Sequence, residues 1–183
     1  MTIAGGQRCF IRPAVPADVR AITAIYAPVV EHSIASFELV PPNEAEMARR
    51  LRSGSGLPWL VAAQGDQVAG YAYASRFRQR PAYRWSVETS VYVADAHTGR
   101  GVGKQLMTAL IDRLVADGYV MAFAAIALPN PVSEGLHESL GFRPVGVFCD
   151  VGYKHGGWRD VAWWSRQLRM PPEEPEEPVD PNR

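Results

Sequence analysis

One short stretch, residues 88–104, constrains the fold of this chain more than any other, and it reads E-T-S-V-Y-V-A-D-A-H-T-G-R-G-V-G-K. The β-branched and aromatic side chains at 91–93 favour an extended strand. The glycines at 99, 101 and 103 then allow backbone conformations that other residues resist. Apolar side chains recur every four residues from Val102 to Leu114, and Gly118 is placed to end a helix. The sequence therefore predicts a strand, a glycine loop and an amphipathic helix in succession.

A glycine loop that opens a helix presents backbone N–H groups at the positive end of the helix dipole, where a diphosphate can bind. Spacing excludes two common phosphate-binding motifs. A Walker loop needs glycine where this chain has Thr98, and Ser or Thr where it has Gln105. A dinucleotide fingerprint needs its third glycine where this chain has Lys104. The sequence thus predicts a phosphorylated ligand held by another kind of loop, and the alternative is a surface loop without a ligand.

Composition argues against several other classes of partner. Nineteen basic residues balance nineteen acidic ones, so no net field draws the chain to nucleic acid or to an anionic membrane. Cys9 and Cys149 have no metal-ligand spacing, and the four histidines form no zinc pattern. The longest apolar run, Tyr119 to Leu128, is about half as long as a membrane helix and is typical of a buried strand. We therefore expect a cytoplasmic protein with no nucleic acid, no membrane and no metal among its partners.

The pattern of apolar runs and breakers predicts one domain of the α/β class. A chain of 183 residues with 47% hydrophobic side chains can bury one core of ordinary size. Helices are expected to begin near residues 18, 43, 102 and 131. Strands are expected at 9–12, 59–63, 68–74, 85–93, 119–128, 143–153 and 159–168. The resulting order, β-α-α-β-β-β-α-β-α-β-β, describes a mixed α+β sheet covered by helices on both faces.

The domain is expected to span residues 8–169. The remainder, residues 171–183, holds five prolines and six acidic or asparagine side chains. Such a segment has too few apolar side chains to offset the entropy of ordering. We expect it to form a tail outside the fold.

The glycine loop resembles the acyl-CoA loop of the GNAT superfamily of N-acetyltransferases. That signature has Gln or Arg, two residues, Gly, one residue, then Gly or Ala, and here Thr98 replaces the leading Gln or Arg. Four further segments resemble the phosphinothricin and methionine sulfoximine N-acetyltransferases in the same order: residues 78–93, 125–130, 136–142 and 152–161. The resemblance covers about Ile11 to Leu168. It implies the GNAT acyl-CoA N-acyltransferase fold and transfer of an acetyl group from acetyl-CoA to a primary amine.

The resemblance also implies where acetyl-CoA binds. Its diphosphate is expected on the backbone N–H groups of the glycine loop, which do not depend on the side chain at Thr98. Its pantetheine arm is expected beside the preceding strand. Asn130 either hydrogen-bonds that arm or serves only as the N-cap of the following helix. The expected cofactor-binding residues are Val91, Tyr92, Val93, Gly99, Arg100, Gly101, Val102, Gly103, Lys104 and Asn130.

Two residues are candidates for catalysis. An amine is mostly protonated at neutral pH, so N-acetylation needs a base or a water chain leading to one. Glu88 lies directly before the expected cofactor-pairing strand and shares one face with Ser86, Ser90 and Tyr92; the alternative is a structural glutamate paired with an arginine. By resemblance, His137 occupies a position where many relatives carry a tyrosine that protonates the departing thiolate. The alternative there is a histidine that only packs in its helix.

The residues before Glu88 indicate the acceptor. Arg78 and Arg80 lie just upstream, and a guanidinium suits a carboxylate or phosphinate in two-point contact. Phe37 and Tyr83 are candidates for the walls around the rest of the molecule, Phe37 through the resemblance alone. The basic flank argues against a polycationic acceptor and for a small amino-acid-like substrate. The expected substrate-binding residues are Phe37, Arg78, Arg80, Tyr83, Glu88, Thr89 and Ser90.

The expected activity is therefore direct acetylation of the α-amine of phosphinothricin, methionine sulfoximine or methionine sulfone, with Glu88 as base. The alternatives are another small amine or a protein N-terminus as acceptor, a non-catalytic acetyl-CoA sensor, and a ping-pong enzyme using Cys9 or Cys149. Neither cysteine has a neighbouring histidine in sequence. The resemblance also implies a homodimer formed with the last strands, where Trp163 and Trp164 point to opposite faces.

Overall fold

A computed structural model describes residues 9–53, 56–65 and 67–179 of the chain. The helices and strands follow the expected order, and the short 3₁₀ turns between them were not expected. The elements are β1 (Phe10–Pro13), α1 (Val19–His32), α2 (Glu44–Ser53), β2 (Trp59–Gln64), β3 (Gln67–Arg76), β4 (Ser86–Val93), α3 (Val102–Ala116), β5 (Met121–Ala127), α4 (Pro131–Ser139), β6 (Arg143–Lys154) and β7 (Gly157–Gln167). No helix in the described ranges is long and apolar enough to cross a membrane.

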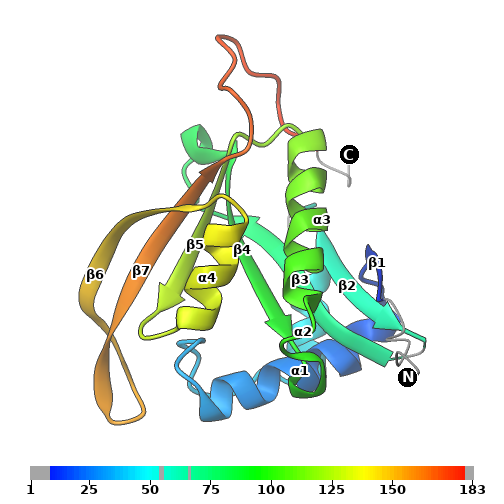
Figure 1. Cartoon of the computed structure of the whole chain (residues 1–183). Helices are drawn as coiled ribbons and strands as arrows, with labels where there is room; N and C mark the ends of the chain where they lie inside the picture. The colour runs from blue at the N-terminus through cyan, green and yellow to red at the C-terminus, as the bar shows by residue number, and fades with distance from the viewer. Residues whose placement is uncertain (1–8, 54–55, 66, 180–183) are drawn as a thin grey trace, which may run out of the picture.

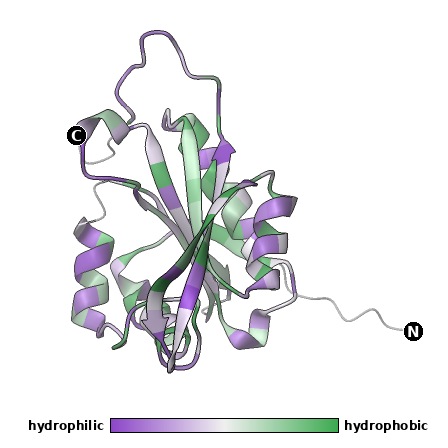
Figure 2. Cartoon of the chain, turned by 90° about the vertical axis from the view of Figure 1, so that its left-hand side faces the viewer, coloured by the Kyte–Doolittle hydropathy of each residue, from purple (hydrophilic) through white to green (hydrophobic). Residues whose placement is uncertain are grey.

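The strands form one seven-stranded sheet in the order β1-β2-β3-β4-β5-β7-β6. The pair β4–β5 is parallel, and the other neighbouring strands are antiparallel. Helices lie on either side of the sheet, as the view coloured by hydropathy shows (Figure 2). This is the mixed α/β architecture that the order of elements predicts.

Two apolar clusters hold the helices to the sheet. On one face, the stripe predicted after the glycine loop is fully buried at Leu106, Leu110 and Leu114 of α3. On the other face, Tyr26 of α1 and Tyr71 of β3 belong to a second cluster with α2. Residues on alternate positions of β4 therefore face either the α3 side or the α1–α2 side.

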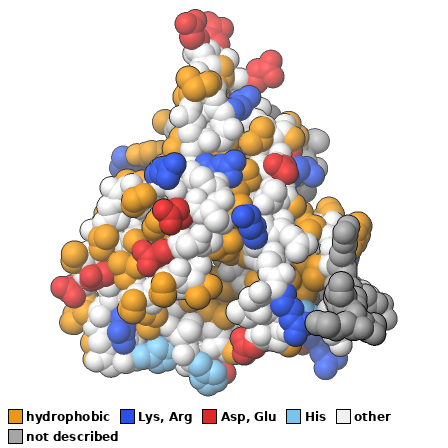
Figure 3. All heavy atoms as spheres, viewed as in Figure 1, with side chains coloured by type: hydrophobic (Ala, Val, Ile, Leu, Met, Phe, Trp, Pro, Cys, Tyr) orange, Lys and Arg blue, Asp and Glu red, His pale blue; other side chains and the backbone are white. Residues whose placement is uncertain are grey.

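The C-terminal segment differs from the expected free tail. Trp85 donates its indole N–H to the Glu176 carbonyl at 2.8 Å, and the Val179 N–H donates to the Asp117 carbonyl at 2.8 Å. Arg84 and Glu177 form an ion pair. The segment leaves β7, loops beyond the end of the sheet with acidic side chains at its tip, and returns to the end of α3 (Figures 1 and 3).

Composition alone did not predict this docking because the contacts of the segment are polar and use its main chain. Prolines also limit the freedom of the unfolded segment, so less entropy is lost when it docks. Residues 176–179 therefore dock on the domain, which the expectation of a free tail did not include. Residues 180–183 lie outside the described part of the chain.

Candidate active site

The sheet opens between β4 and β5. The two strands pair only at Ser86–Met121, Val87–Ala122 and Glu88–Phe123, and then diverge (Figure 1). At the point of divergence, the Thr89 hydroxyl donates to the Phe123 carbonyl at 3.1 Å. Beyond it, β4 stays paired with β3 on its other side up to Val93. The edge of β4 that faces the gap therefore has backbone groups available to a ligand.

A cavity of about 460 Å³ fills this gap. It is bounded by β4, the glycine loop, the first turn of α3, β5, α4 and the end of α1. Every expected cofactor-binding residue except the exposed Arg100 lines it: Val91, Tyr92, Val93, Gly99, Gly101, Val102, Gly103, Lys104 and Asn130. Thr89, Ser90 and His137 line it as well.

Sequence reasoning missed one wall of this cavity. Val29, Ser33 and Ala35 line it from α1 and the segment that follows. No local signal in the sequence marks these residues, because they reach the cavity only through the packing of α1 against the sheet.

The glycine loop is shaped to receive an anion. Gly99 and Gly101 have φ angles of 73° and 78°, a left-handed conformation that favours glycine. No side chain caps α3 at Gly101, and the first amides of an α-helix have no acceptor within the helix. Because Gly101 to Lys104 line the cavity, these N–H groups and the positive end of the helix dipole are available to a bound diphosphate.

Glu88 is half-buried at the closed end of the gap. Its register partner on β3 is Ser75. Tyr92, on the same face of β4 as Glu88, packs edge-on against Tyr26 of α1 with ring centroids 4.9 Å apart. Burial raises the pKa of the Glu88 carboxyl, and the positive charge of Arg78 partly opposes this shift. Among residues 9–53, 56–65 and 67–179, no ion pair joins Glu88 to an arginine.

Glu88 is next in sequence to residues that line the cofactor cavity but does not line it itself. Its neighbours Thr89 and Ser90 line the 460 Å³ cavity, whereas Glu88 is not among the lining residues. By alternation along the strand, the carboxyl shares the face of Ser90 and Tyr92, at the closed end of the gap. A raised pKa and the lack of an ion pair are properties that suit a proton acceptor better than a structural charge.

His137 is buried in the wall of the cavity, with 4% of its surface exposed. Its Nδ1 lies 2.8 Å from the Ser133 carbonyl, so Nδ1 carries the proton and donates it. The neutral ring then has its lone pair on Nε2, which is buried without a partner among the described residues. Burial lowers the pKa of the imidazole. The ring also packs edge-on against Phe142, with centroids 5.1 Å apart.

Asn130 fits both of the interpretations considered for it. Its side-chain oxygen accepts the Ser133 N–H at 3.1 Å, so it is the N-cap of α4. The residue also lines the cavity. An amide whose oxygen caps the helix keeps its NH₂ group as a donor.

The expected substrate-binding residues fall into separate groups. Arg78, Arg80 and Tyr83 surround a cavity of about 290 Å³ that also contacts Ser86 and Val87, at the start of β4. The guanidinium of Arg78 lies over the rings of Phe77 and Trp163, at 4.4 Å and 5.6 Å from their centroids. Phe37 is not in this group and instead contacts the β6–β7 hairpin at Gly152.

The two cysteines lie apart from the residues that line the cofactor cavity. Cys9 and Cys149 are both free, and neither lines the 460 Å³ cavity. In the described ranges, no group of three or more His, Cys, Asp or Glu side chains is placed to hold a metal ion.

Trp164 is buried in the core, whereas Trp163 faces the aromatic rings near Arg78, so the two tryptophans do point to opposite faces.

Comparison with known proteins agrees with this geometry. Residues 23–142 match the model of the acetyltransferase (GNAT) family. A phosphinothricin N-acetyltransferase of Streptomyces viridochromogenes is 42% identical over 92% of this chain and 93% of its own length. An L-methionine sulfoximine/L-methionine sulfone acetyltransferase of Pseudomonas aeruginosa is 39% identical over 88% of this chain and 95% of its own length.

A solved structure gives the same result for the fold. The GNAT phosphinothricin acetyltransferase of Sinorhizobium meliloti, crystallised in complex with acetyl-CoA, is 42% identical and superposes with a TM-score of 0.89. The match covers 96% of this chain and 97% of the other. The chain therefore belongs to the GNAT family and is an N-acetyltransferase.

Proposed function

We propose that this enzyme acetylates the α-amine of a small amino-acid analogue, such as phosphinothricin, methionine sulfoximine or methionine sulfone, with acetyl-CoA as co-substrate. The observation that carries the proposal is one cavity that joins the open edge of β4 to the uncapped N-terminus of α3. The names of the relatives support the acceptor class, because proteins that cover most of this chain are named for these analogues.

The chain's own residues fit acetyl-CoA. Bound in the cavity, acetyl-CoA supplies an activated thioester. The N–H groups of Gly101 to Lys104 would hold its diphosphate. The free edge of β4 and the NH₂ group of Asn130 would pair with the polar groups of its pantetheine arm. The neighbouring structure in complex with acetyl-CoA supports this assignment.

Glu88 is proposed as the general base. Burial raises the pKa of Glu88, which makes its carboxylate a stronger base. The carboxylate would take a proton from the acceptor ammonium, directly or through water. The freed amine nitrogen then forms its bond to the acetyl carbon, and the bond from that carbon to sulfur breaks. Direct transfer is preferred over a thiol intermediate because neither cysteine lines the cavity.

His137 is proposed as the acid that protonates the departing thiolate, and the structure sets a condition on this role. In the neutral ring, Nε2 accepts a hydrogen bond and cannot donate a proton. His137 can act as an acid only as imidazolium, a form that burial disfavours. The role therefore depends on proton transfer to Nε2 during the reaction.

Arg78 and Arg80, with Tyr83, are proposed to bind the acidic group of the acceptor. They share the cavity at the start of β4, two residues from Glu88 along the strand. Two guanidinium groups suit a carboxylate together with a phosphinate or sulfoximine oxygen. Thr89 and Ser90, which lie between the base and the cofactor edge, complete the proposed acceptor site.

A homodimer is proposed on the basis of the last strands. Apolar side chains are exposed along the β6–β7 hairpin: Val145, Val147, Phe148, Val151, Tyr153 and Trp158. Hydrophobic side chains gather over these strands in the space-filling view (Figure 3). Several large exposed apolar side chains on one hairpin favour an interaction site there. Light scattering of the purified protein is expected to give twice the mass of the chain.

A thiol-release assay tests the proposed function. The purified enzyme with acetyl-CoA is offered phosphinothricin, methionine sulfoximine, methionine sulfone, glutamate, methionine and spermidine. We expect turnover with the phosphinate, sulfoximine and sulfone compounds and little with spermidine. The reverse ranking refutes the acceptor assignment, and thiol release without any acceptor, with an acetylated cysteine, refutes direct transfer.

A further inference from the structure

The tip of the β6–β7 hairpin reaches across the molecule to the segment that follows α1. Lys154, with 4% of its surface exposed, donates from Nζ to the carbonyls of Val30 at 2.7 Å and Ser36 at 2.6 Å. The adjacent His155 has its Nε2 3.2 Å from the Ser33 carbonyl. These contacts join parts of the chain that are more than 100 residues apart.

A second contact of the hairpin involves a ring and a glycine. A Cβ atom added at Gly152 would lie 2.1 Å from Cε2 of Phe37, far inside van der Waals contact. The ring of Phe37 therefore occupies the space that any other residue at position 152 would need. By contrast, a Cβ added at Gly146 on the same strand meets nothing within 4 Å.

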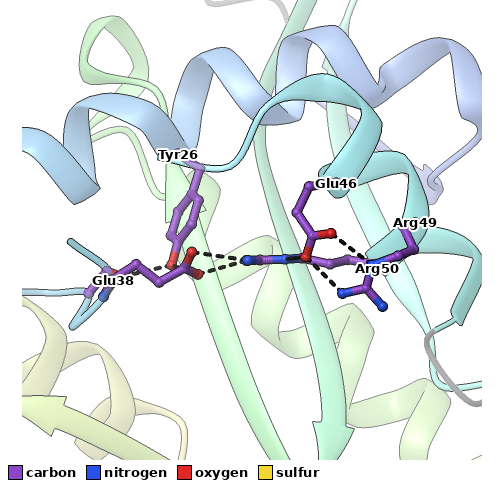
Figure 4. A network of polar contacts seen from close by, with 6 residues as sticks. Tyr26, Glu38, Glu46, Arg49 and Arg50 are labelled. Carbon is purple, nitrogen blue, oxygen red and sulfur yellow. Dashed lines mark hydrogen bonds and ion pairs between the residues drawn. The ribbon is translucent and has the colours of Figure 1, made fainter. Parts of the chain in front are cut away.

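The same segment is fixed from the side of α1 and α2. The Tyr26 hydroxyl lies 2.7 Å from Oγ of Ser36 and donates to Glu38 at 2.9 Å. Arg50 binds Glu38 through two hydrogen bonds of 2.6 Å and 3.0 Å (Figure 4). Residues 33–38 thus lie between a polar network on one side and the hairpin on the other.

A buried ammonium is a costly way to hold a segment. Its transfer from water is unfavourable unless hydrogen bonds replace those to water, and here two backbone carbonyls accept such bonds. The carbonyls of Val30 and Ser36 are directional acceptors. An apolar side chain at position 154 would leave both carbonyls without this donor. The arrangement therefore specifies where the segment lies, because both carbonyls must face Nζ of Lys154.

We propose that Lys154 and Gly152 are positioning residues of the transferase: Lys154 fixes the segment that carries the wall of the cofactor cavity, and Gly152 fixes the ring of Phe37. Ser33 and Ala35 of that segment form a wall of the cofactor cavity. Phe37, which lies apart from the cavity at Arg78 and Arg80, carries the ring that the resemblance places at the acceptor. The part of the inference that concerns Phe37 rests on the proposed function. The part that concerns the cofactor wall does not require an identified acceptor.

The contact between Gly152 and Phe37 is tested with a double-mutant cycle. Gly152→Ala is expected to raise the KM for methionine sulfoximine about 10-fold, with the KM for acetyl-CoA within about 2-fold. Gly146→Ala on the same strand is the matched control and is expected to change neither. In a Phe37→Ala background, Gly152→Ala is expected to have no further effect, because the ring it would displace is absent. An equal rise in KM in both backgrounds would overturn the assignment of Gly152.

Lys154 is tested without any acceptor. Lys154→Met is expected to weaken acetyl-CoA binding about 10-fold by calorimetry and to speed hydrogen exchange of the amides in 33–38, with no change in α3. Arg143→Met, which removes an exposed charge from the same strand, is the control. Lys154→Gln keeps a donor on a shorter side chain and provides a second variant if the first fails to fold. A folded Lys154 variant with wild-type affinity and exchange would overturn the proposal, whether or not the acceptor assignment holds.

Discussion

Glu88 and Phe123 form the last register pair between β4 and β5 before the two strands separate. The backbone of Glu88 is thus held by a neighbouring strand on each side, since Ser75 of β3 is its partner across the other edge. One residue further on, Thr89 binds the Phe123 carbonyl through its side chain. The proposed base therefore stands on a part of the strand that is paired on both sides, directly beside the unpaired edge of β4. If Glu88 is the base, as proposed, a single strand would fix its distance from a thioester bound along that edge.

Replacing the proposed base tests this arrangement first. Glu88→Gln keeps the size of the side chain but removes its ability to take a proton, so kcat at pH 7 is expected to fall about 100-fold or more. Acetyl-CoA affinity by calorimetry is expected to stay close to that of the wild type, because Glu88 does not line the cofactor cavity. Glu44→Gln, on the exposed start of α2, is the control. Wild-type turnover in Glu88→Gln would remove this residue from the mechanism.

The pKa of Glu88 predicts the acidic limb of the pH profile. Burial raises this pKa above the ordinary value of 4.5, and the charge of Arg78 lowers it. Since the base works as the carboxylate, kcat is expected to fall as the pH drops through the raised pKa. Arg78→Met removes the positive charge that favours the carboxylate, so the limb is expected to move to higher pH. The measurement is kcat at saturating acceptor, which separates this effect from weaker binding, and a shift to lower pH would contradict the assignment.

Local sequence signals predicted the elements well. The spacing of apolar residues after the glycine loop located α3, and the Asn130–Pro131 pair located the start of α4, because both depend on interactions a few residues apart. The opening between β4 and β5 and the wall at Ser33 and Ala35 depend on which strands pair and how α1 packs. No single segment contains that information.

The residues of the candidate site divide in the same way, into those that local sequence signals identify and those that depend on packing between distant segments. Most of the expected cofactor-binding residues follow one another along the chain from Val91 to Lys104, so a motif could identify them. Arg78 was chosen for its chemistry and Phe37 through the resemblance alone, and the structure places them against different elements. The buried contact of Lys154 with Val30 was missed because a lysine in a Lys-His-Gly-Gly turn is typical of an exposed hairpin tip.

The conformation of the glycine loop gives a prediction for cofactor binding. Gly101 has a φ of 78°, where an alanine costs about 1 kcal/mol or more of backbone strain. Gly101→Ala is expected to turn the loop and raise the KM for acetyl-CoA about 10-fold, because its amides would no longer face the diphosphate. Gly65→Ala provides the matched control, since Gly65 has a φ of 60° in the β2–β3 turn. It should lower the Tm to a similar degree without changing this KM, and an equal rise in KM would indicate a general loss of stability.

The protonation state of His137 decides between its two roles. Because Nδ1 donates to the Ser133 carbonyl, an acid role requires a second proton on Nε2, and burial makes that form scarce at neutral pH. His137→Phe keeps an aromatic ring against Phe142 and removes the acid, so we expect kcat to fall about 10-fold while the Tm stays within a few degrees of the wild type. Unchanged kcat together with a lower Tm would assign His137 to packing alone, and the proton for the thiolate would then have to come from another group.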